Sequence, residues 1–159
     1  MNTPSTSRRR LLLGGAAALL APLARAATPL VPAPPLVEVW KSPTCGCCQD
    51  WIRHLEANGM RCKVYDEGNT DARARFGLPL RYGSCHTALI GGYVIEGHVP
   101  AREIQRLLRE KPQALGLAVP AMPVGSPGMD GPEYQGRKDP YDVLLIAENG
   151  SARVYQSYR

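Results

Sequence analysis

Three cysteines lie within four positions of the segment SPTCGCCQDW, residues 42–51. Cys45 and Cys48 have the C-x-x-C spacing of a thiol–disulfide redox pair, and Cys47 adds a third thiol between them. A disulfide exchanger needs one attacking and one resolving thiol, so a third thiol would compete with both. Thiolates are also metal ligands, and three of them could surround one or more ions. Both chemistries stay open at this point, and the extra thiol favours metal binding.

Further side chains suited to metal binding occur later in the chain. Cys85 and His86 are adjacent, and His98 follows them. Met122 and Met129 flank a stretch rich in Pro and Gly, where packing into a core is harder to arrange. Thioether sulfur is a soft ligand that suits Cu(I) and suits Zn(II) poorly. These five residues complete the set of candidate ligands.

The apolar pattern around these residues predicts the element order β-α-β-α-β-β-α. The first strand covers residues 36–40, and the helix that follows runs from a Thr44 cap to about Asn58. The buried face of this helix is expected to contain Cys48, Trp51, Ile52 and Leu55. Later strands are expected at residues 60–65, 87–90 and 93–96, and later helices at residues 70–76 and 100–110. This is the order of a thioredoxin-like α/β fold.

The C-terminal part of the chain has a different pattern. Residues 115–140 are rich in Gly and Pro and show no periodicity, which predicts a long loop. Residues 141–147 and 152–158 flank Asn149-Gly150, a strong hairpin signal. We therefore expect one domain over residues 36–159, a thioredoxin-like fold with an appended C-terminal β-hairpin at residues 141–158.

The expected fold brings the candidate ligands together. The cysteine cluster occupies the first turn of the first helix, where free N–H groups and the helix dipole stabilise thiolates. The third strand runs antiparallel beside the first, so Cys85 and His86 should face that helix terminus. Redox proteins of this fold usually have a cis-proline there, so its replacement favours a metal site. The fourth strand ends at the same edge and makes His98 a ligand or a hydrogen-bond partner of one.

Two residues of similar chemistry are assigned no role in the site. Cys62 shares a strand face with Met60 and Val64, which predicts a buried and inert thiol. His54 lies two helical turns beyond Cys47, about 10 Å along the axis, which is too far for a shared ion. We expect His54 on a solvated face.

The N-terminus has the pattern of an export signal. Arg8, Arg9 and Arg10 precede an uncharged segment, Leu11 to Leu23, and Ala24-Arg25-Ala26 has the A-x-A form of a cleavage site. The apolar run is too short to span a bilayer. The paired arginines predict the twin-arginine (Tat) route, with Sec as the alternative. Residues 1–26 are thus a predicted signal peptide and residues 27–35 a Pro-rich linker, and the mature protein is expected in the periplasm without a membrane span.

The charge balance does not indicate a nucleic-acid surface. The chain has 19 Lys and Arg against 14 Asp and Glu, but four of the arginines belong to the signal. The remainder has 15 basic and 14 acidic residues, a net charge of +1, and no phosphate-binding Gly-rich loop. Outside the cytoplasm thiols tend to form disulfides, and five cysteines leave at least one unpaired or bound to something else.

Three separated motifs carry a resemblance to a known family: SPTCGCCQDW, SCHTALIGGYVIEGHVPA and GLAVPAMPVGSPGM. Residues 37–129 resemble the exported bacterial "predicted metal-binding protein" family, which includes the copper-resistance protein CopG. The resemblance implies a thioredoxin-like fold, copper binding by the C-x-C-C motif and a role in periplasmic copper homeostasis. The ligands that it implies are Cys45, Cys47, Cys48, Cys85 and His86, with His98, Met122 and Met129 as further positions.

Three functional hypotheses follow. The first is a periplasmic protein of copper resistance that binds Cu(I), has other periplasmic copper-handling proteins as partners, and has no assigned catalytic residue. Its four thiolates and one imidazole exceed the roughly two to four ligands of one Cu(I), which favours a thiolate-bridged multi-copper cluster with a Cu(I)/Cu(II) redox role. The second is a thiol–disulfide oxidoreductase that uses Cys45 and Cys48 and leaves Cys47 and Cys85 unexplained. The third is a zinc site formed by Cys45, Cys47, Cys48 and His86, which leaves Cys85 and the methionines unexplained.

Overall fold

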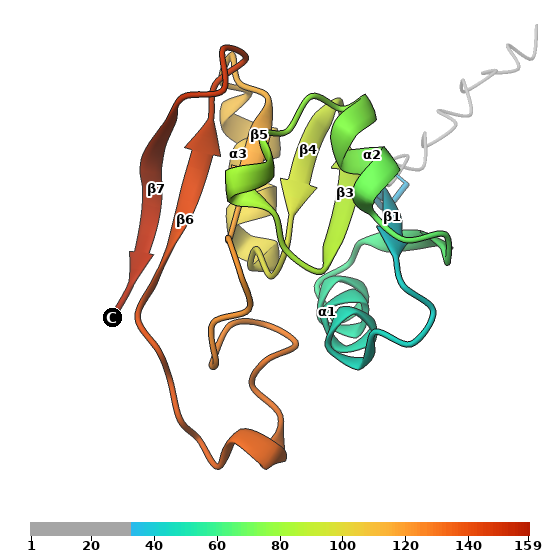
Figure 1. The fold of residues 1–159 in the computed structure, drawn as a ribbon, viewed down its shortest axis with the longest axis vertical. Helices are drawn as coiled ribbons and strands as arrows, with labels where there is room; N and C mark the ends of the chain where they lie inside the picture. The colour runs from blue at the N-terminus through green and yellow to red at the C-terminus, as the bar shows by residue number, and fades with distance from the viewer. Residues whose placement is uncertain (1–32) are drawn as a thin grey trace, which may run out of the picture. The chain divides into compact units, whose positions relative to one another are not determined.

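One seven-stranded sheet with flanking helices forms the body of the protein (Figure 1). The structure is a computed structural model and describes residues 33–159. The sheet and its helices confirm the predicted mixed α/β class. The predicted signal peptide and most of the predicted linker lie outside the described residues. Between residues 33 and 159, no helix combines the length and the apolar character needed to cross a bilayer.

The elements follow one another in the order expected from the sequence up to the third helix. In chain order they are β1 (Leu36–Lys41), α1 (Gly46–Ala57), β2 (Arg61–Tyr65), α2 (Thr70–Arg75), η1 (Leu80–Tyr82), β3 (His86–Ile90), β4 (Tyr93–Glu96), α3 (Ala101–Glu110), β5 (Gly116–Ala118), η2 (Pro132–Tyr134), β6 (Tyr141–Ile146) and β7 (Ala152–Tyr158).

The strand directions bring three chain segments to one edge of the sheet. The spatial order is β2-β1-β3-β4-β5-β6-β7. β1 runs parallel to β2 and antiparallel to β3, and β3 runs antiparallel to β4. The ends of β1 and β4 therefore lie at the same edge as the start of β3. In the register, Lys41 at the end of β1 pairs with His86 at the start of β3.

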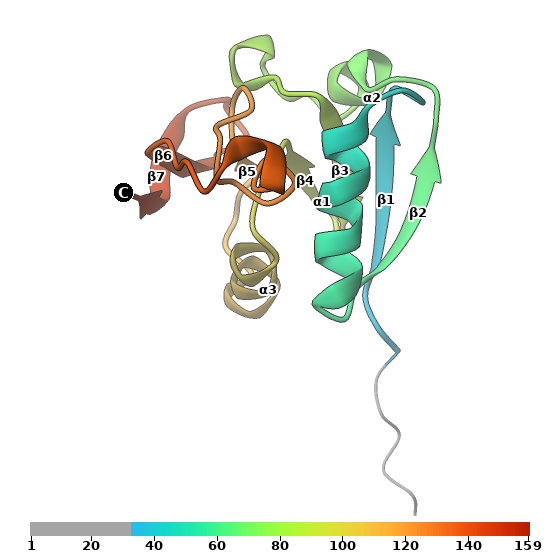
Figure 2. The same cartoon turned by 90° about the horizontal axis from the view of Figure 1, so that it is seen from below.

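Helix α1 begins one residue later than predicted. Its N-cap residue is Cys45, which makes no side-chain capping bond. The predicted Thr44 cap is wrong, because the Thr44 hydroxyl instead lies 3.2 Å from the Ser42 hydroxyl. The predicted buried face is confirmed: Cys48, Trp51, Ile52 and Leu55 are all buried. Figure 2 shows α1 running alongside β1, with the turn between them at one end.

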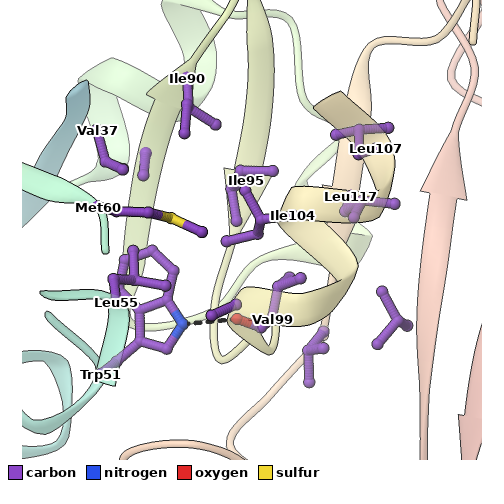
Figure 3. Packing of buried hydrophobic residues seen from close by; sticks show 14 of the residues in the cluster. Val37, Trp51, Leu55, Met60, Ile90, Ile95, Val99, Ile104, Leu107 and Leu117 are labelled. Carbon is purple, nitrogen blue, oxygen red and sulfur yellow. Dashed lines mark hydrogen bonds between the residues drawn. The ribbon is translucent and has the colours of Figure 1, made fainter. Parts of the chain in front are cut away.

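Alternate residues of the central strands pack into two separate clusters, as the two-residue period of a strand requires. Ile95 and Leu117 join α1 and α3 in the larger cluster, which also contains Trp51, Leu55, Ile104 and Leu107 (Figure 3). Val94 and Ala118 belong to a second cluster with Leu78 and Ile146. Helices α1 and α3 therefore cover one face, and the segment around Leu78 packs on the opposite face.

The region predicted as one long loop contains two short elements. Residues 116–118 form β5, which pairs with β4 and β6, and residues 132–134 form η2. A strand of three residues is too short to show a period. β6 and β7 pair antiparallel through the predicted turn and continue the same sheet by way of β5. The intervening segment, drawn in orange in Figure 1, loops out beyond the strand ends on the side of α1.

Candidate metal centre

The three clustered cysteines occupy the start of α1. Cys45 and Cys48 form a disulfide, while Cys47 has a free thiol whose Sγ lies 3.6 Å from Sγ of Cys45. Cys48 is fully buried, whereas Cys45 and Cys47 are partly exposed. The first-turn N–H groups of a helix and its dipole favour negative charge at this terminus. The location therefore suits thiolates, whether they act on a disulfide or bind a metal.

Cys85 lies at the centre of the predicted ligands. Its Sγ is 3.8 Å from Sγ of Cys47, 3.3 Å from Nδ1 of His86 and 3.1 Å from Nε2 of His98. Two groups of potential metal ligands result, and within each group the donor atoms lie no more than 4.8 Å apart. The first contains Cys45, Cys47, Cys48 and Cys85, and the second contains Cys85, His86 and His98. The Cys85 sulfur belongs to both groups.

Both histidines have a fixed orientation. Nε2 of His86 lies 3.0 Å from the carbonyl oxygen of Gly97, and Nδ1 of His98 lies 2.8 Å from that of Pro127. A carbonyl only accepts, so each of these nitrogens carries the proton. The other nitrogen of each ring therefore presents a lone pair toward Cys85. Metal-binding histidines are commonly held in this way, with the second nitrogen donating to a carbonyl.

Burial keeps the two imidazoles and the Cys85 thiol uncharged in the metal-free protein. It lowers the pKa of His86 to about 3, with a further decrease from His98 nearby. Burial also lowers the pKa of His98 and raises the pKa of the Cys85 thiol to about 12, to which Cys47 contributes. Neutral imidazole is the form that binds metal. A cation in the site would reverse the effect on the thiol, because it favours thiolate.

The Gly/Pro segment packs directly on the cysteine helix. At Gly128, where φ is +85°, an added Cβ would lie 2.5 Å from the carbonyl oxygen of Cys47 and 2.8 Å from the backbone nitrogen of Trp51. Met129 follows, partly buried, and its sulfur accepts a hydrogen bond from Tyr134 at 3.4 Å. Met122 is 48% exposed and lines an open hollow beside Tyr141. The structure thus brings the Met129 segment to the cysteines and leaves Met122 on the surface.

The two residues predicted to lie outside the site, Cys62 and His54, both differ in part from expectation. Cys62 is only partly buried, but burial still raises the pKa of its thiol to about 11, in keeping with an inert thiol. The predicted solvated face for His54 is wrong. Its Nε2 accepts the backbone N–H of Ala101 at 3.0 Å and so binds the first turn of α3. Neither residue belongs to the two ligand groups.

A buried ion pair beside the site was not predicted from the sequence. Arg73 of α2 donates to Glu96 at the end of β4, and Glu96 is fully buried. The same carboxylate accepts the backbone N–H of Ser84, the residue before Cys85. An arginine in a short polar helix and a glutamate before a glycine look like surface charges in the sequence, and only the strand order brings them together.

Known proteins that are similar to this chain include one family and two solved structures. Residues 82–129, which contain Cys85 and both histidines, match a family described as "Protein of unknown function, DUF411". No curated protein matches the chain. Two solved structures of the copper resistance protein CopG are similar to it. Form 2 is 43% identical, with 79% of this chain and 99% of that chain covered and a TM-score of 0.72. Form 1 is 45% identical, covers 79% and 98%, and has a TM-score of 0.72.

Identity at this level, over nearly the whole of the solved protein, leaves little room for an unrelated origin. The chain therefore belongs to the family of the copper resistance protein CopG.

Proposed function

We propose that this protein binds Cu(I) in the cysteine–histidine site and that thiolate sulfur bridges more than one copper ion. The observation that carries the proposal is the position of the Cys85 sulfur, which is shared by the four-cysteine group and the Cys85–His86–His98 group. Thiolate and imidazole are ligands that copper accepts, and thiolates favour Cu(I) in particular. Two adjoining groups with a common sulfur suit a bridged cluster better than a single ion.

The arrangement of the sheet supports a thioredoxin-like classification. β1 and β2 are parallel, β3 and β4 follow in antiparallel order, and α1 begins directly after β1. We infer that β5, the Gly/Pro segment and the β6–β7 hairpin extend this core, and that the extension adds Met129 to the surroundings of the cysteines. Met122 would contribute only if its segment moved.

The disulfide between Cys45 and Cys48 supports a redox role. Oxidation of two thiolates to a disulfide releases two electrons, which is enough to reduce two Cu(II) to two Cu(I). In the disulfide state the remaining donors are Cys47, Cys85 and the two histidines. The number of thiolates available to copper therefore depends on the oxidation state of this pair. A place in periplasmic copper resistance, reached through the Tat-like signal and shared with other copper-handling proteins, completes the proposal.

Copper content per chain tests this function. The chain from Ala27 onward is reduced, loaded anaerobically with Cu(I), desalted and analysed by mass spectrometry. We expect more than one copper per chain, a large loss in Cys85→Ser because it removes a ligand of both groups, and an intermediate loss in Cys47→Ser. Cys62→Ser is the matched control, since Cys62 belongs to neither group. Wild-type protein that retains no copper, or an equal loss in Cys62→Ser, would refute the proposal.

A thiol–disulfide oxidoreductase is the second candidate, favoured by the same Cys45–Cys48 bond. In that case Cys47→Ser would retain insulin reduction, and copper content would not depend on Cys47. Zinc is the third candidate. The four-cysteine group has a ligand set that zinc accepts, although the set predicted from the sequence, with His86 in place of Cys85, is not one of the groups that the structure brings together. Counting zinc beside copper in the same samples separates these two metals.

A further inference from the structure

The carboxylate of Glu96 contacts the sequence neighbours of two ligands in the second group, and Glu96 lies on the same chain segment as the third. Its Oε1 accepts the backbone N–H of Ser84 at 2.6 Å, next to Cys85. Its Oε2 accepts the Thr87 hydroxyl at 2.6 Å, next to His86. Glu96 itself stands two residues before His98. One buried side chain thus connects the backbone segments that carry Cys85, His86 and His98.

Arg73 completes this arrangement from α2. Its Nε and Nη2 lie 2.9 Å and 2.7 Å from Oε1 of Glu96, and Nη2 also lies 2.7 Å from the carbonyl oxygen of Ser84. Asn69 donates to that same carbonyl at 3.0 Å. Both backbone polar groups of Ser84 are therefore bound. Cys85 is held between this fixed peptide and His86, whose carbonyl accepts the N–H of Gly97 at 3.0 Å.

A buried ion pair is a poor means of stabilising a fold, because the cost of removing both charges from water offsets much of their attraction. Apolar side chains of similar volume often serve stability as well or better. The hydrogen bonds around Ser84 are better explained if the ion pair positions the backbone next to Cys85. We propose that Arg73 and Glu96 are positioning residues for the metal centre and hold the Cys85 sulfur where the two ligand groups share it.

This inference rests on the proposed copper site, but part of its test needs no metal. The test variant is the double substitution Arg73→Met with Glu96→Leu, which removes both charges together and leaves neither unpaired. Glu96→Gln is the conservative variant, because an amide retains an acceptor for Ser84 and Arg73. The matched control is Glu110→Gln, which removes the exposed ion pair of the same type between Arg106 and Glu110.

The first readout is alkylation by iodoacetamide in the metal-free disulfide form, followed by peptide mapping of the free thiols Cys47, Cys62 and Cys85. Loss of positioning accelerates alkylation at Cys85 and leaves Cys62 unchanged. Simple destabilisation of the fold would instead accelerate both thiols together, because global opening exposes β2 as well. Equal acceleration at Cys62 and Cys85, or no change at Cys85, would overturn the inference.

The second readout is Cu(I) affinity, from competition between bathocuproine disulfonate and the reduced protein. Loss of residues that orient ligands typically weakens metal binding by roughly 10- to 100-fold. We expect that loss in the double variant, a smaller one in Glu96→Gln and none in Glu110→Gln. If the double variant does not fold, Thr87→Val removes one bond to Glu96 without a charge and is expected to change both readouts in the same direction. Wild-type protein that binds no copper would refute the proposed function, and alkylation would still decide this inference.

Discussion

Replacing Gly128 by alanine should separate the Gly/Pro segment from the cysteine helix. The backbone of Gly128 has a φ of +85°, and its added Cβ would lie 2.5 Å from the Cys47 carbonyl oxygen and 3.2 Å from Cα of Trp51. The atoms it would meet belong to the backbone of α1, which cannot rotate away as a side chain can. The segment itself must therefore move, and it carries both Met129 and the Pro127 carbonyl that orients His98.

Gly136 provides a control in the same segment. Its φ is +74°, and nothing lies within 4 Å of an added Cβ. Both alanines bear the left-handed backbone cost of about 1–2 kcal/mol, but only Gly128→Ala adds a steric clash. Insertion of one methyl into a packed site typically costs about 1–3 kcal/mol. The difference in unfolding free energy between the two variants should therefore be about 1–3 kcal/mol, with Gly128→Ala the less stable.

Urea unfolding of the metal-free chain from Ala27 gives this difference directly, provided that the m-values of the two variants agree. Copper content after Cu(I) loading is the second measurement, and we expect it to fall in Gly128→Ala and not in Gly136→Ala. If the two variants have equal stability and equal copper content, the Gly/Pro segment is not held against α1 as described.

Two further predictions concern His54 and Trp51. Burial lowers the pKa of His54 in the folded protein, against an opposing effect of Asp130, so the unfolded chain takes up a proton first as the pH falls. The stability that His54 contributes is therefore complete above about pH 6.5 and is lost below it. Wild type should lose more unfolding free energy between about pH 7 and about pH 5 than His54→Gln does, and parallel losses would contradict the lowered pKa of His54. The Trp51 ring centroid lies 4.2 Å from that of His86, so in Trp40→Phe, which leaves Trp51 as the remaining tryptophan of two, copper should quench the emission. Emission that copper leaves unchanged would argue against an ion beside His86.

The order of the elements and the proximity of the cysteines to His86 and His98 were largely predictable because they depend on local patterns. The helical spacing of Cys48, Trp51 and Leu55 identified the buried face of α1, and strand direction alone placed His98 at the same edge as the cysteines. The hydrogen-bond partners of the ligands were not predictable. Glu96 and Arg73 are separated in the chain, and nothing in their immediate neighbours indicates burial. Their role arises only when α2, β3 and β4 pack together.

The Gly/Pro segment illustrates a second limit. Its lack of periodicity predicted one long loop, which the structure interrupts with β5 and η2. The same pattern could not show which methionine would approach the cysteines. Met129 follows a glycine that lies against α1, whereas Met122 follows Ala121, which adopts a φ of +61° at the surface. Such backbone conformations depend on tertiary hydrogen bonds, here from Ala121 to Gly83 at 3.3 Å. A sequence pattern contains no information about them.

The candidate ligands differ in their access to solvent. Cys45, Cys47 and Cys85 are each partly exposed, whereas His86 and His98 are fully buried. An ion that arrives from outside therefore meets a cysteine sulfur before it reaches either imidazole. Exchange with a donor or acceptor that presents its own thiols would be fast at the outer cysteines and slow at the histidines.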